Sequence, residues 1–190
     1  EHAGVMPPVS TALYGELGEI YYQWHQLDRA HENFQRSIKV STLSGYADAE
    51  LYYGVILSRL HQIEGNLDGA IREIQQTVDL MHVEAPSLVG EEIIAQEVGV
   101  YLAQGHLAAA EAALKKHRFH FGKQFSFPAL GENTTRPMGI LYISALRILL
   151  HRALTKSELE NLKEGIKIAE GLIHDALQHQ YVPLALELLL

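Results

Sequence analysis

The chain has 190 residues, with 15 Lys and Arg against 23 Asp and Glu, so its formal net charge is −8 at pH 7. This length allows one domain with a hydrophobic core or a short array of repeats, and the negative charge argues against direct contact with nucleic acid. No cysteine is present, which excludes disulfides, thiolate metal sites and cysteine nucleophiles and fits the cytoplasmic location that we expect.

One turn sequence recurs three times along the chain. Ala30, Ala70 and Ala110 each follow a leucine by three residues, and successive alanines are 40 positions apart. Equal spacing with matching turns is the signature of an internal repeat. We therefore place the first three repeats at about 11–44, 47–82 and 87–117.

Each repeat is predicted to be a helical hairpin. Gly65 and Gly105 stand where a helix ends in a left-handed residue, and Asp28 and Asp68 stand where the next helix needs a capping oxygen or a first-turn negative charge. Upstream of each turn, apolar residues at helical spacing predict one buried stripe on the first helix. These residues are Leu13, Leu17, Ile20 and Tyr21, then Val55, Leu57, Leu60 and Ile63, then Ile94, Val98, Tyr101 and Leu102.

The regularity ends after the third repeat. Residues 118–136 contain several Phe, two Gly and a Pro without helical periodicity, which predicts a long loop. A fourth hairpin is expected at about 137–179, and Ser157 with Glu160 forms a capping box at the start of its second helix. The stretch from Met138 to Leu150 falls short of the roughly 20 apolar residues of a membrane span, so we expect no membrane partner.

The first repeat resembles the tetratricopeptide signature W-x2-L-G-x2-Y…A-x3-F. The matching residues are Tyr14, Leu17, Gly18, Tyr21, Ala30 and Phe34. Tyr14 replaces the usual Trp, His25 replaces the turn glycine, and Thr42 stands at the closing proline. The resemblance implies an all-α fold, a tetratricopeptide-like α-solenoid of about four helical hairpins in a right-handed superhelix, and we expect residues 1–190 to form a single such domain.

The 40-residue period is longer than the usual 34, and repeats of this longer period with segments such as 19–41 and 65–80 resemble those of MalT-like bacterial regulators of the LuxR type. Proteins of that family combine an ATP-hydrolysing switch, a superhelical domain of this kind and a C-terminal helix-turn-helix. The resemblance implies that this chain is a fragment of a larger protein that binds ATP and DNA through other domains. The chain starts without Met and ends in an apolar run, Leu188–Leu190, which led us to the same expectation.

A search for catalytic chemistry identifies no candidate. The sequence contains no G-x4-G-K-[ST], G-x-G-x2-G, H-E-x2-H or G-x-S-x-G pattern. Paired carboxylates such as Glu91 and Glu92 are typical of helix starts, and His117 with His120 would leave a metal shell half empty. We therefore expect no enzyme activity, no catalytic residue, no metal and no cofactor in this segment.

The candidate binding residues come from the tetratricopeptide register. Positions on the first helix of each hairpin that resemble those lining the inner, concave groove of the family carry Tyr, Gln, Glu and Arg, which can hydrogen-bond a polar ligand. These residues are Glu19, Tyr22, Gln23, Tyr52, Arg59, Gln62 and Gln96.

Two functions stay open. The first is a sensor that binds an effector on its concave face, either a small molecule, with carbohydrate as a natural candidate, or a protein or peptide. The second is a free-standing tetratricopeptide scaffold that recruits a protein partner.

Overall fold

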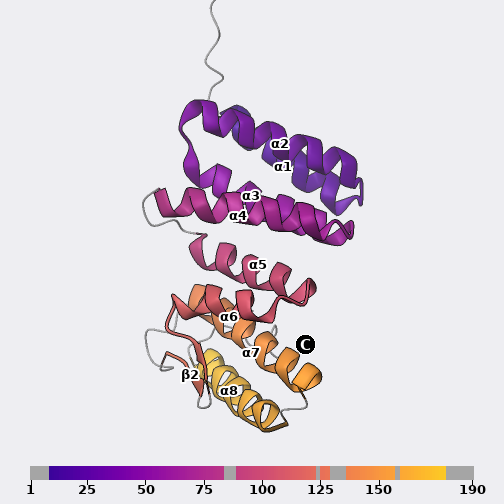
Figure 1. Ribbon diagram of the computed structural model, residues 1–190. Helices are drawn as coiled ribbons and strands as arrows, with labels where there is room; N and C mark the ends of the chain where they lie inside the picture. Colours follow the sequence, from indigo (N-terminus) through magenta and orange to yellow (C-terminus); the bar gives the residue numbers. More distant parts are fainter. Residues whose placement is uncertain (1–8, 84–88, 123–124, 129–135, 157–158, 179–190) are drawn as a thin grey trace, which may run out of the picture. The chain divides into compact units, whose positions relative to one another are not determined.

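The computed structural model describes residues 9–83, 89–122, 125–128, 136–156 and 159–178 (Figure 1). Within these ranges the chain forms eight helices and two short strands, which confirms the prediction of an all-α fold. The helices are α1 (Val9–Gln23), α2 (Leu27–Ser44), α3 (Ala47–Ile63), α4 (Leu67–Val83), α5 (Gly90–Ala103), α6 (Leu107–Lys115), α7 (Arg136–Lys156) and α8 (Leu159–Gln178). Each predicted repeat thus contains two consecutive helices.

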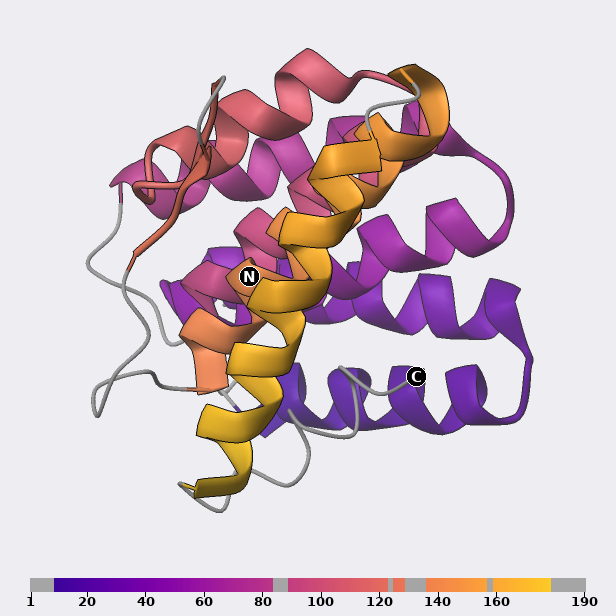
Figure 2. The ribbon, with the colours of Figure 1, turned by 90° about the horizontal axis from the view of Figure 1, so that it is seen from below.

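Contacts along the chain separate two compact units, Glu1–Gln96 and Glu97–Leu190. In the first unit, α1 packs on α2, α2 on α3, and α3 on α4, so neighbours in sequence are neighbours in space. In the second unit, α6 packs on α7, and α8 runs alongside α7 (Figure 2). The organisation of residues 1–190 as a single domain stays a prediction.

The three predicted hairpin turns have the same backbone geometry. The left-handed residue is His25 in the first turn (φ 57°), Gly65 in the second (φ 75°) and Gly105 in the third (φ 74°). The next residue in each turn donates its N–H to the carbonyl five positions earlier, at 2.8 to 2.9 Å. Such bonds satisfy carbonyls that a helix end would otherwise leave free. The turns are therefore structural equivalents, and His25 fills the glycine position.

The predicted alanines allow close helix packing. Ala30, Ala70 and Ala110 are all fully buried. In the second hairpin, the hydroxyl of Ser58 on α3 donates to the carbonyl of Ala70 on α4, at 2.9 Å. A larger side chain at Ala70 would separate these two backbones.

The predicted capping oxygen of the second turn comes from a neighbouring residue. The side-chain oxygen of Asn66 accepts the N–H of Gly69 at 2.9 Å, which is the standard bond of a helix cap. Asp28 and Asp68 lie in the first turns of α2 and α4, where a negative charge favours the helix dipole. The capping box predicted at Ser157 lies outside the described residues.

The buried stripe predicted for the first helix is wrong. Leu13, Leu17 and Ile20 are 59%, 42% and 41% exposed, whereas Gly15 and Gly18 are buried. The physical reason is space, because a Cβ on Gly18 would lie 2.5 Å from the ring of Phe34, and a Cβ on Gly15 would overlap the Tyr53 hydroxyl. The glycine face of α1 therefore receives the aromatic rings of its neighbours, and the leucine face remains exposed. In α3, by contrast, Val55, Leu57 and Leu60 are buried as predicted, although Ile63, the last residue of the helix, is 53% exposed.

Part of the predicted loop at 118–136 is a β ribbon. Strands β1 (His120–Phe121) and β2 (Phe125–Ser126) pair antiparallel, with Phe121 opposite Phe125. Phe127 contacts the rings of Phe119, Phe121 and Phe125 at centroid distances of 5.3 to 6.3 Å. This aromatic cluster buries apolar surface that a solvated loop would expose, which explains local order where helical periodicity ends.

One stretch of α7 has the length and hydropathy of a membrane span. The window Met138–Thr155 has a mean hydropathy of 1.3, and 39% of it is buried. Its buried residues recur at helical spacing and lie on one face of the helix. They include Leu141, Tyr142, Ala145, Ile148 and Leu149.

Candidate functional site

A cavity of about 260 Å³ opens among α1, α2 and α3 of the first unit. Five of the seven predicted binding residues line it, together with two apolar residues. The lining residues are Glu19, Tyr22 and Gln23 from α1, Phe34 from α2, and Tyr52, Ile56 and Arg59 from α3. Residues 52, 56 and 59 share one face of a helix, as do residues 19, 22 and 23, so the packing of α1, α2 and α3 brings both sets to one space.

A hydrogen bond crosses the cavity from α3 to α1. The hydroxyl of Tyr52 donates to Oε1 of Glu19 at 3.0 Å. Burial first, and then this bond to a carboxylate, raise the pKa of Tyr52 to about 12, while the nearby Arg59 acts against the rise. Tyr52 is therefore a neutral donor at physiological pH, and it holds the Glu19 carboxylate in place.

Arg59 supplies the positive charge of the cavity. Its side chain is exposed, and among the residues that the structure describes it forms neither a hydrogen bond nor an ion pair. A guanidinium has five N–H donors in a planar fork suited to carboxylate or phosphate. The cavity thus combines an anchored carboxylate and an available guanidinium.

The other two predicted residues lie elsewhere. Gln96 is 8% exposed, and its Nε2 donates to Ser58 Oγ and to Gln62 Oε1, both at 3.2 Å. Gln62 and Gln96 therefore belong to a polar network between α3 and α5, and neither lines the cavity. A role for them in binding stays a prediction.

The sequence reasoning did not select the two apolar members of the cavity wall. Phe34 was assigned to the hairpin core, where it is indeed fully buried. Ile56 lies four residues after Tyr52 and three before Arg59, and this helical spacing was the signal that could have identified it.

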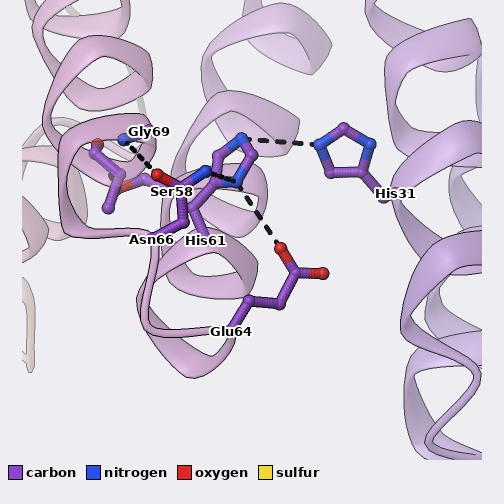
Figure 3. Close-up of polar contacts among 7 residues, drawn as sticks. His31, Ser58, His61, Glu64, Asn66 and Gly69 are labelled. Atoms are coloured by element: carbon purple, nitrogen blue, oxygen red, sulfur yellow. Dashed lines mark hydrogen bonds and ion pairs between the residues drawn. The ribbon is translucent and has the colours of Figure 1, made fainter.

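A histidine pair lies at the packing surface between α2 and α3 (Figure 3). The Nε2 atoms of His31 and His61 are 3.4 Å apart, and Nδ1 of His61 is 3.6 Å from Glu64. Burial, and then the charge of His61, lower the pKa of His31. No group of three His, Asp or Glu suited to a metal ion occurs in the part of the chain that the structure describes. The pair is therefore best described as a titratable contact between two helices.

The second unit contains a larger cavity of about 460 Å³ between α6 and the β ribbon. Its lining includes Phe119, Phe121 and Glu111, and no predicted binding residue. Glu111 already pairs with Arg152 at 2.8 Å. The polar lining of this cavity also includes Lys115 and His120.

Comparisons with known proteins do not assign a family. No protein-family model matches the chain, and a search of curated proteins finds no match.

Proposed function

We propose that this chain is the sensing segment of a MalT-like, ATP-dependent transcriptional regulator, built as a tetratricopeptide-like superhelix that binds an effector on its concave face. The observation that carries the proposal is the cavity among α1, α2 and α3, which gathers Glu19, Tyr22, Gln23, Tyr52 and Arg59. The three equivalent turns at a 40-residue period support the repeat architecture.

The proposed mechanism is a shift between two conformations. The cavity walls come from both members of the first hairpin and from the first helix of the second, so a ligand would bridge two hairpins. A ligand that prefers one arrangement of these hairpins favours that arrangement by its difference in affinity. In the regulator, this preference would be passed to switch and DNA-binding domains elsewhere in the polypeptide.

A thermal-shift screen of sugars, oligosaccharides, amino acids and short peptides tests the binding role. A ligand at about 100 times its Kd stabilises the folded state by about 2.7 kcal/mol, which raises the Tm by roughly 5 to 10 °C in a chain of this size. Tyr52→Ala and Arg59→Ala should each remove most of the shift caused by a hit. A full shift in both variants would exclude this cavity as the binding site.

The regulatory role has a separate test. The complete reading frame should encode a phosphate-binding loop before this segment and a helix-turn-helix after it, and their absence would contradict the role as regulator.

A free-standing scaffold for a protein partner is the second candidate. It is favoured by exposed apolar residues on α1 and in the turn that follows it, because Val9, Leu13, Leu17 and Trp24 are 42% to 66% exposed. Exposed apolar stripes of this kind are typical of protein interfaces. In this case Leu17→Lys should abolish capture of the partner, whereas Arg59→Ala should have no effect.

A further inference from the structure

The chemistry of the cavity among α1, α2 and α3 indicates which class of small molecule it would bind; this inference rests on the proposed binding function. Two opposite charges line the same space, Glu19 on α1 and Arg59 on α3. The hydroxyl of Tyr52 is bonded to Glu19, and Arg59 lies near enough to influence its ionisation. The Tyr52 hydroxyl thus lies close to both charged groups.

Both charged groups have unused hydrogen-bonding capacity. A carboxylate offers about four lone-pair positions, and the recorded partner of Glu19 is the single Tyr52 hydroxyl. Arg59 uses none of its five donors among the described residues. The cavity therefore has free acceptors and free donors, each on a charged group.

The size of the cavity and its apolar wall limit which ligands it can bind. Liquid water occupies about 30 Å³ per molecule, so about 260 Å³ holds on the order of ten non-hydrogen atoms. Ile56, which is partly exposed, provides an apolar surface beside the charged groups, whereas Phe34 is fully buried. A ligand of this size with a positive end, a negative end and an apolar branch matches every part of the lining.

We propose that the cavity binds a free amino acid with an apolar side chain. Its ammonium group donates to Glu19, its carboxylate accepts from the guanidinium of Arg59, and its side chain packs against Ile56. A neutral sugar would satisfy the hydrogen bonds without using either charge. Because the Arg59 fork matches a carboxylate in two parallel bonds, the carboxylate is expected to be the stricter requirement.

Isothermal titration with the free amino acids, the corresponding amides and the N-acetyl derivatives tests this assignment on the whole chain. We expect leucine, isoleucine, valine, methionine or phenylalanine to bind. Leucinamide, which lacks the carboxylate, and N-acetylleucine, which lacks the ammonium, should each bind at least tenfold more weakly than leucine. Equal affinity of a free amino acid and both blocked derivatives would overturn the proposal.

Variants of the two charged residues test which end of the ligand each residue binds. Arg59→Gln should weaken leucine at least tenfold and leave leucinamide unchanged, while Glu19→Gln should weaken leucine and leave N-acetylleucine unchanged. Arg72→Gln on α4 removes an exposed positive charge outside the cavity and should leave the affinity for leucine unchanged. Melting curves without ligand check that each variant is folded.

The outcomes separate this inference from the function on which it rests. Binding of maltose or another neutral sugar without binding of any amino acid would overturn the amino-acid assignment and leave the sensing role supported. Absence of binding by every amino acid, derivative and sugar, with the chain folded, would overturn the amino-acid assignment, whereas the sensing role would then be contradicted only if peptides also failed to bind in the thermal-shift screen.

Discussion

At the scale of single residues, two glycines define how α1 packs. Gly18 lies against Phe34, which is fully buried and cannot move without disturbing the core. The tetratricopeptide signature includes Gly18, and its close contact with Phe34 accounts for a glycine inside a helix, which costs about 1 kcal/mol relative to alanine.

Gly18→Ala should lower the free energy of unfolding by about 1 to 3 kcal/mol, because the added Cβ would be 2.5 Å from the Phe34 ring. Gly99→Ala on α5 is the matched control, since no atom lies within 4 Å of a Cβ there, and it should raise the free energy of unfolding by up to about 1 kcal/mol. Urea denaturation measures both. A gain in stability for Gly18→Ala would contradict the packing of α1 on α2.

His25 occupies a backbone position that favours glycine. With φ at 57° it carries a side chain where Gly65 and Gly105 have none. His25→Gly should therefore stabilise the chain by up to about 1 kcal/mol, as the left-handed conformation costs a residue with a Cβ about that amount.

Gly65→Ala is the reciprocal change and should destabilise the chain by about 1 kcal/mol. Thermal unfolding of both variants gives the comparison. The two variants should change the Tm in opposite directions. A change in the same direction would contradict the equivalence of the two turns.

Some residue-level predictions needed information that a sequence does not contain. Helical spacing groups Tyr52 with Arg59 and Glu19 with Tyr22, so these residues could be predicted to share a surface. The burial of Gln96 depends on how α5 lies against α3, and its bond to Ser58 joins positions 38 residues apart. No local pattern encodes that contact.

At the scale of elements, the sequence predicted the helices and turns well but the buried face of α1 poorly. In α3 three of the four predicted apolar residues are buried and Ile63 is exposed, whereas in α1 the glycines are buried and Leu13 and Leu17 are exposed. Periodicity identifies an apolar face without showing which partner is available to cover it. Within the described residues, the glycine face of α1 is covered by Phe34 of α2 and Tyr53 of α3.

The contact between α2 and α3 should depend on pH through His31. Folding lowers the pKa of His31 below 6.5, so this histidine binds a proton more readily in the unfolded chain than in the folded chain. The free energy of unfolding should therefore fall as the pH drops below 6.5. Protonation would place a positive charge beside His61, although Glu64 and Asp28 partly compensate. Glu73 on α4 also lies near His61.

Between pH 7 and pH 5, the Tm of His31→Asn should therefore fall less than the Tm of the parent chain. His120→Gln, which changes an exposed histidine on β1, serves as the control and should keep the parental pH dependence. An unchanged slope in His31→Asn would show that the histidine pair does not contribute.

At the scale of the whole molecule, the two units differ in what they offer a ligand. The first combines equivalent hairpins with a cavity lined by Glu19 and Arg59, whereas the second has aromatic packing and a cavity lined by Lys115 and by Glu111, which is paired with Arg152. The period of 40 residues made the repeat predictable. The β ribbon at 118–136 was not, because its order depends on contacts among four phenylalanines and Tyr142.

Hydrogen exchange, measured with and without the best-binding compound of the screen, tests the central claim most directly. If the cavity among α1, α2 and α3 is the binding site, the ligand should slow exchange in Val9–Gln23, Leu27–Ser44 and Ala47–Ile63. Exchange in α7 and α8 should be unchanged, and Tyr52→Ala should abolish the effect. Slower exchange in α6, α7 or α8 without protection of α1 and α3 would contradict the account.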